Sequence, residues 1–130
     1  MFDRFTEKSR RVIFYSRDEA SQSGSAYIET EHLLLGLLRE DEELAERFRQ
    51  SPGGLEAVRQ RIAAAMPPGA KIPTSVDMPL SRASRRVLTN AIDTADAMGQ
   101  SEINVGHLAL GLLSEEKCLA AEILRERGLG

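Results

Sequence analysis

The chain has 130 residues, of which 42% are hydrophobic and 28% are charged, and its net charge is −3. This length and composition are typical of a single globular domain that needs no disulfide or metal to fold. An acidic balance argues against nucleic-acid binding, which needs a clustered basic surface. No apolar run approaches the ~20 residues of a membrane span. We therefore expect neither nucleic acid nor membrane as a partner.

The predicted elements of the first half are four helices. Thr6 is a suitable N-cap and Gly24 a suitable stop for the first helix. Thr30 is the next predicted N-cap, and its helix runs to about Arg39 and is apolar nearly all round, which indicates a buried element. The third predicted helix spans residues 41–50. The fourth spans residues 52–66, with Ser51 as its N-cap and Pro52 as its first residue.

A proline-rich segment, residues 67–79, is expected to be a linker. Beyond it we predict three helices with N-caps at Ser81, at Asn104 or Val105, and at Ser114, and with ends near Gly99, Leu113 and Arg127. No segment alternates apolar and polar residues for long enough to predict a strand. The sequence therefore predicts an all-α fold.

The chain contains two copies of one sequence unit. Residues 32–38 recur as 107–113 with six of seven positions identical, and the same offset, 107 − 32 = 75, carries residues 9–12 onto the similar residues 84–87. A fixed-period match predicts two pseudo-symmetric copies that bury their apolar faces against each other. We assign residues 1–66 to the first copy and 80–130 to the second, within a single domain over residues 1–130.

The second copy has no room for a fourth helix, because the counterpart of Leu55 is residue 55 + 75 = 130, the final glycine. We therefore expect the surface built from Leu108, Leu112 and Ile123 to be left partly open. Exposed apolar patches of that size mark interfaces. Self-association through the second copy is one expected consequence.

Several repeated or single residues have structural interpretations. His32 and His107 each begin an apolar helix and are expected to be hydrogen-bonded rather than catalytic. Gly36 and Gly111 lie within helices, where glycine costs up to ~1 kcal/mol relative to alanine, so close helix contacts are expected there. The single Cys118 cannot form an internal disulfide, and there is no secretory signal, which favours a cytoplasmic setting.

The segments Phe5–Val12 and Ile28–Leu37, with the same plan repeated, resemble the Clp amino-terminal repeat domain, and most closely its ClpC type. The resemblance covers nearly the whole chain. It implies a module that binds substrate and adaptor proteins and passes them to a Clp-type ATPase, in the same chain or in another. It also implies that the module has no chemistry of its own.

In ClpC-type members the acidic residue before the repeated histidine is implicated in binding phosphorylated arginine, and that position here is Glu31. Thr6, Glu7 and Thr30 also stand at helix starts, where free N–H groups suit a phosphoryl group. The second copy has Val105-Gly106 before its histidine and Arg82 in place of Glu7, so a second site is not expected there. Glu31 could instead be a first-turn acid that complements the helix dipole.

Three further residues form a possible partner surface: Phe2, Arg10 and Arg11. Phe2 could instead be a hydrophobic staple, which is the interpretation we favour. The arginine-rich face of the first helix could be solvated or could steer an acidic partner. A free-standing regulator that competes for Clp adaptors is an alternative function. An enzyme is a third, but the sequence has no phosphate loop, no H-E-x-x-H and no Cys/His cluster. We expect no catalytic residue, metal or cofactor.

Overall fold

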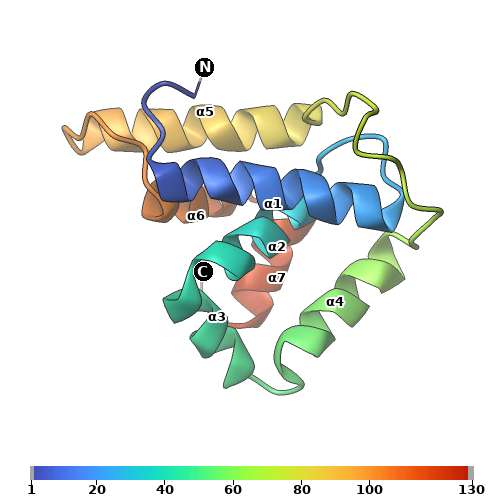
Figure 1. The fold of residues 1–130 in the computed structure, drawn as a ribbon. Helices are drawn as coiled ribbons and strands as arrows, with labels where there is room; N and C mark the ends of the chain where they lie inside the picture. Colours follow the sequence, from blue (N-terminus) through green and yellow to red (C-terminus); the bar gives the residue numbers. More distant parts are fainter. Residues whose placement is uncertain (1, 129–130) are drawn as a thin grey trace.

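The computed structural model describes residues 2–128, which contain seven helices and no β-strand (Figure 1). The helices are α1 (Glu7–Ser23), α2 (Thr30–Glu40), α3 (Glu42–Arg49), α4 (Gly54–Ala65), α5 (Arg82–Ala97), α6 (Val105–Ser114) and α7 (Leu119–Glu126). The predicted all-α fold is confirmed.

Helix pairs α1–α2 and α5–α6 are the two matching cores of the repeat. Thr6 and Ser81 cap α1 and α5 in the same way, since each hydroxyl accepts the backbone N–H of the serine three residues on. An added Cβ at Gly36 of α2 would lie 2.5 Å from the carbonyl oxygen of Val12 in α1. An added Cβ at Gly111 would lie 2.5 Å from the carbonyl of Val87. The predicted close contacts exist and are equivalent.

The two copies are joined crosswise. The segment before α1 pairs with the loop before α6, where the N–H of Thr6 donates to the carbonyl of Ile103 over 3.1 Å. The segment before α5 pairs in the same way with the loop before α2, where the N–H of Ser81 donates to the carbonyl of Ile28 over 3.0 Å. Each copy therefore places the start of its first helix beside the start of the other copy's second helix.

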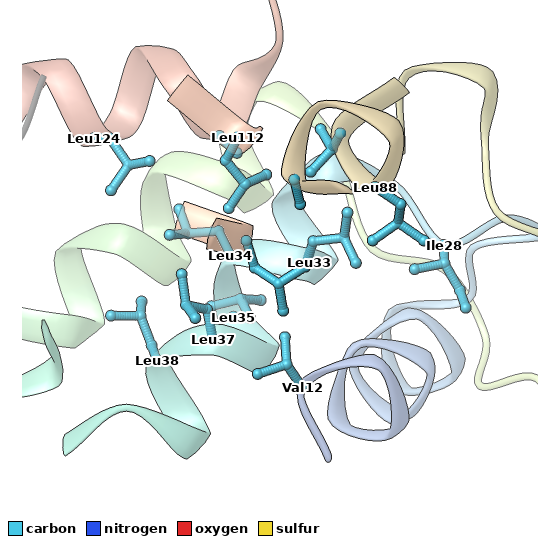
Figure 2. Close-up of a cluster of buried hydrophobic side chains, with 14 of the residues drawn as sticks. Val12, Ile28, Leu33, Leu34, Leu35, Leu37, Leu38, Leu88, Leu112 and Leu124 are labelled. Atoms are coloured by element: carbon cyan, nitrogen blue, oxygen red, sulfur yellow. The ribbon is translucent and has the colours of Figure 1, made fainter. Parts of the chain in front are cut away.

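Helix α2 lies at the centre of the core, and every residue from Thr30 to Leu38 is buried. Its leucines converge with buried side chains of α1, α5, α6 and α7, as Figure 2 shows for Val12, Leu88, Leu112 and Leu124. This confirms the burial predicted from its continuous apolar sequence. Burying such side chains contributes roughly 1.5–3 kcal/mol each before entropy is counted.

Helix α4 packs at the edge of the domain and contributes only Val58 and Ile62 to the buried core (Figure 1). Charged contacts hold the rest of it. Arg59 reaches Glu19 of α1, and Arg61 reaches Glu122 and Glu126 of α7. The segment from α4 to α5 then follows the end of α1, where the N–H of Gly69 donates to the carbonyl of Ser23.

Two predicted helix starts in the first copy were wrong. The N-cap of α2 is Glu29 rather than Thr30, which is its first residue. Ser51 does not cap α4; its hydroxyl donates to the carbonyl of Phe48 instead. The turn continues through Gly53, which is the N-cap of α4 at φ 80°. Glycine adopts this left-handed conformation without strain, so the helix begins after Pro52.

The last helix is also shorter than predicted. Ser114 is the final residue of α6, and its hydroxyl donates to the carbonyl of Leu110. A turn follows, and Cys118 caps α7 by accepting the N–H of Ala121 at its sulfur. Cys118 is partly exposed.

The expectation of an open apolar surface on the second copy was wrong. Leu108, Leu112 and Ile123 are only 3%, 1% and 1% exposed. Helix α7 packs against α2 and α4 as well as α6, so elements of the first copy cover part of this surface. The apolar patch expected to drive self-association is therefore not formed by these residues.

The close helix contacts predict the effect of adding one methyl group. Gly36→Ala and Gly111→Ala should each lower the free energy of unfolding by about 1–3 kcal/mol, because backbone atoms of the facing helix must move. Gly106→Ala is the matched control, since its Cβ would approach only the side-chain oxygen of Asn104, at 3.1 Å. Urea unfolding followed by circular dichroism measures all three. Equal stability of Gly111→Ala and Gly106→Ala would contradict the packing described.

Candidate functional site

Glu31 is a buried carboxylate at the second position of α2, and only 4% of it is exposed. No Lys, Arg or His among residues 2–128 forms an ion pair with it. Burial raises its pKa above the usual value of 4.5, and the nearby Glu29 carboxylate raises it further. Buried charges are normally paired, so an acid in this position is unusual.

A cavity of about 380 Å³ lies beside Glu31. Its apolar walls are Leu35 of α2 and Ile62, Ala63 and Met66 at the end of α4. Hydroxyl and amide groups at the end of α1 complete it. This volume is in the range of small ligand sites, and an apolar lining with a few polar groups is their usual composition.

A second carboxylate in the cavity is already neutralised. Glu19 is 8% exposed and accepts bonds from Arg59, at 2.9 and 3.1 Å, and from Arg39, at 3.2 Å. Arg59 therefore already forms an ion pair with Glu19. The cavity consequently contains one compensated acid and, at Glu31, one acid without a cation.

The two repeated histidines have the same structural role, as predicted. The N–H of Glu29 donates to Nδ1 of His32 over 2.9 Å, and the N–H of Asn104 donates to Nδ1 of His107 over 2.9 Å. The ring hydrogen of the neutral imidazole is then on Nε2, which lies 3.2 Å from the Ser23 hydroxyl in the first copy. Burial lowers the pKa of His32 to about 4, so it remains neutral beside Glu31 at neutral pH.

The four predicted ligand-binding residues do not form one site. Thr30 and Glu31 begin α2, beside the end of α1. Thr6 and Glu7 are at the opposite end of α1, a separation of roughly 25 Å for a 17-residue helix. The crossed pairing places Thr6 beside Ile103, at the start of α6, where the second copy has no acid.

The predicted partner-surface residues are engaged within the domain. Phe2 packs edge-on against Phe5 with ring centres 5.1 Å apart, which is a contact within the segment before α1 and not a staple to the helix itself. Arg10 donates to the backbone carbonyl of Phe2, and Arg11 binds Glu40 through two bonds. All three residues have contacts within the domain, and their role as a partner surface stays a prediction.

Sequence reasoning missed the contribution of α4 to the cavity, because Ile62, Ala63 and Met66 follow Glu31 by more than 30 residues and belong to the unrepeated helix. It also missed that the start of α5 lies beside the start of α2. Ser81 and the exposed Arg82 follow Leu80, which pairs with Ile28 just before α2. The repeat offset shows which positions are equivalent, but it does not show which elements of the two copies lie side by side.

Within residues 2–128 no helix is both long and apolar enough to cross a bilayer. The same residues contain no group of three or more potential metal-binding side chains.

A helical double repeat of this kind belongs to a known class of domain. Residues 4–127 match the family described as the Clp repeat (R) N-terminal domain. The ClpC/MecB protein of Bacillus subtilis (strain 168), a negative regulator of genetic competence, is 32% identical over 130 residues, which is 99% of this chain and 16% of that protein. The chloroplastic chaperone protein ClpC2 of Arabidopsis thaliana is 35% identical over 98% of this chain and 13% of its own length.

Solved structures agree with this assignment. The N-terminal domain of the ClpD chaperone from Arabidopsis thaliana superposes with a TM-score of 0.77 at 29% identity, covering 100% of this chain and 91% of that one. The Hsp104 N-terminal domain from Candida albicans, at 21% identity and a TM-score of 0.76, shares the fold. The chain belongs to the Clp amino-terminal repeat family, and it spans about one sixth or less of the length of the relatives given above.

The lowered pKa of His32 predicts a pH dependence of stability. The unfolded histidine takes up a proton near pH 6.5, while the folded one resists protonation until about pH 4. Stability from this group is complete above pH 6.5 and is lost as the pH falls to 4, by roughly 3 kcal/mol. Denaturant unfolding between pH 7 and pH 5 should show the loss, and His32→Asn should reduce it. An NMR titration in which His32 ionises near pH 6.5 would contradict the prediction.

Proposed function

We propose that this domain is a non-catalytic module that binds substrate or adaptor proteins for a Clp-type ATPase. Membership of the family supports the proposal, since the relatives' names describe Clp chaperones and ATP-binding subunits of Clp proteases. The ATPase could be in the same chain or in another. A regulator that acts on its own by competing for adaptors remains the alternative. The cytoplasmic setting stays a prediction, because several of the similar proteins are chloroplastic.

We further propose that the ligand is an arginine-phosphorylated segment and that Glu31 receives its guanidinium group. The observation that supports this is the Glu31 carboxylate, which is buried beside the cavity and has no ion pair among residues 2–128. A carboxylate and a guanidinium form paired charge-assisted hydrogen bonds. The phosphoryl group needs positive groups outside this pair. Arg59 lines the cavity, and the start of α5 with Arg82 lies beside the loop before α2.

Calorimetry with an arginine-phosphorylated peptide tests this assignment. Glu31→Gln should weaken binding about tenfold or more, because it removes the charge from the paired bonds. Glu7→Gln is the matched control, since this exposed acid lies at the far end of α1 and should leave binding unchanged. Arg59→Gln and Arg82→Gln should identify which group holds the phosphoryl. Two equivalent sites, or an unchanged affinity in Glu31→Gln, would refute the proposal.

The non-catalytic role predicts that the purified chain does not hydrolyse ATP, because its sequence has no phosphate-binding loop. A malachite-green assay against a heat-denatured sample measures this directly. Turnover that follows the folded protein through gel filtration would show that the module has chemistry of its own.

A further inference from the structure

Helix α4 is attached to the domain by its side chains rather than by its backbone. Among residues 2–128, no backbone hydrogen bond joins residues 55–68 to a residue outside 53–68. The first backbone anchor beyond the helix is the N–H of Gly69, which donates to the carbonyl of Ser23 over 2.8 Å. Of the 12 residues of α4, only Val58 and Ile62 are buried. Segments with so few buried apolar contacts are those that open locally in a folded protein.

Two glycines form the joint before α4. Gly53 and Gly54 have φ values of 80° and 60°, which are both in the left-handed region. Glycine adopts this region without strain and moves readily to other backbone conformations. Outside its own helix and chain neighbours, a Cβ added at Gly54 would meet no atom closer than 3.8 Å, so the backbone is not tightly enclosed there. Residues at the end of an element that absorb large backbone changes are the usual hinges of a moving segment.

Ion pairs of two arginines connect α4 to the helices around it. Arg59 reaches Glu19 of α1 over 2.9 Å, and Arg61 reaches both Glu122 and Glu126 of α7 over 3.3 Å. The Arg59 and Arg61 side chains are 50% and 34% exposed. Ion pairs between partly exposed groups are individually weak and are screened by salt. The position of α4 is therefore held largely by contacts that solvent weakens.

The second copy shows that this part of the fold closes without such a helix. Among residues 2–128 it contains no counterpart of α4. Its repeated histidine, His107, is nevertheless only 2% exposed, while His32 beside α4 is 4% exposed. What α4 adds to the first copy at this place is the cavity wall made by Ile62, Ala63 and Met66.

We propose that α4 is a lid over the cavity and that it opens on the hinge at Gly53 and Gly54. The ion pairs of Arg59 and Arg61 hold the lid shut. Opening removes one wall of the cavity and uncovers the apolar side chains beneath α4, which widens the entrance for a segment of a bound protein. This use of the lid rests on the proposed binding role of the domain, whereas the opening itself is a property of the chain alone.

Native-state hydrogen exchange of the full chain, followed by NMR without any ligand, tests the lid. The N–H groups of residues 58–66 should exchange through one common opening that is at least about tenfold more frequent than global unfolding. Raising the salt concentration from 0.1 M to 1 M shortens the screening length from about 10 Å to about 3 Å and should speed this exchange about two- to fivefold, with no such change in α2 or α6. Exchange of α4 only by global unfolding, or graded exchange from its ends without an effect of salt, would overturn the proposal.

A matched pair of arginine variants separates the hold on the lid from a general loss of charge. Arg61→Gln removes the ion pairs between α4 and α7, so it should speed exchange of α4 about two- to fivefold at 0.1 M salt and reduce the effect of 1 M salt. Arg86→Gln removes the same charge from an ion pair between α5 and Glu115, at the end of α6, and should leave α4 unchanged. Circular dichroism confirms that both variants are folded. Equal exchange of α4 in Arg61→Gln and in the unaltered chain would overturn the proposal.

The lid and the phosphoarginine site can fail separately. If α4 opens as described and the arginine-phosphorylated peptide does not bind, the lid stands and the proposed ligand is wrong. If that peptide binds and Glu31→Gln weakens it, while α4 exchanges only by global unfolding, the ligand stands and the lid is wrong.

Discussion

The crossed pairing of the two copies is the constraint on which the other features depend. Two short parallel bridges, Phe5 with Ile103 and Ile28 with Leu80, connect the segment entering each copy to the loop of the other. Both bridges are between buried or partly buried residues, where a lost backbone hydrogen bond costs about 1–3 kcal/mol. The copies are thereby interlocked, and the starts of α1, α2, α5 and α6 are each positioned by the opposite copy.

This interlocking makes two places in the domain equivalent in backbone but different in chemistry. At one of them α2 begins with Thr30 and Glu31, and at the other α6 begins with Val105 and Gly106. Only the first has an acid in its first turn, and helix α4 of the first copy supplies part of the cavity wall beside it. Because the two copies differ in sequence at this position, the first copy has a buried carboxylate beside a cavity.

The cost of this arrangement falls on Glu31. Its burial without a counter-ion raises its pKa, which means that the charged form destabilises the folded state as the pH rises above the usual value for glutamate. A structural acid would be more stable in an exposed first turn, where it would still complement the helix dipole. Burial beside a cavity is more consistent with a site that a cation completes.

Much of the fold could be predicted because the local signals agree with one another. Thr6 and Gly24 bound α1 as expected, and the mid-helix glycines indicated close contacts that the structure contains. The failures were of two kinds. Ser51 and Ser114 have good capping side chains, but glycine turn geometry and a following turn placed the helix starts elsewhere.

The second kind of failure concerned neighbours in space. The repeat shows which residues are equivalent, but not that the start of α1 would meet α6 rather than α2. The predicted site therefore combined Thr6 with Glu31, which lie near opposite ends of α1. The cavity wall supplied by α4 was not predicted. For the same reason we expected an open surface at Leu112. That side chain is buried, and α7 packs against helices of the first copy.

Native-state hydrogen exchange of four backbone N–H groups tests the interlocking most directly. The groups are those of Thr6, Ile28, Ser81 and Ile103, which form the two crossed pairings. If the copies depend on each other, all four should exchange with one common free energy, equal to that of global unfolding. One pair that opens at a clearly lower free energy, while the other stays protected, would show that the copies are independent and would contradict this account.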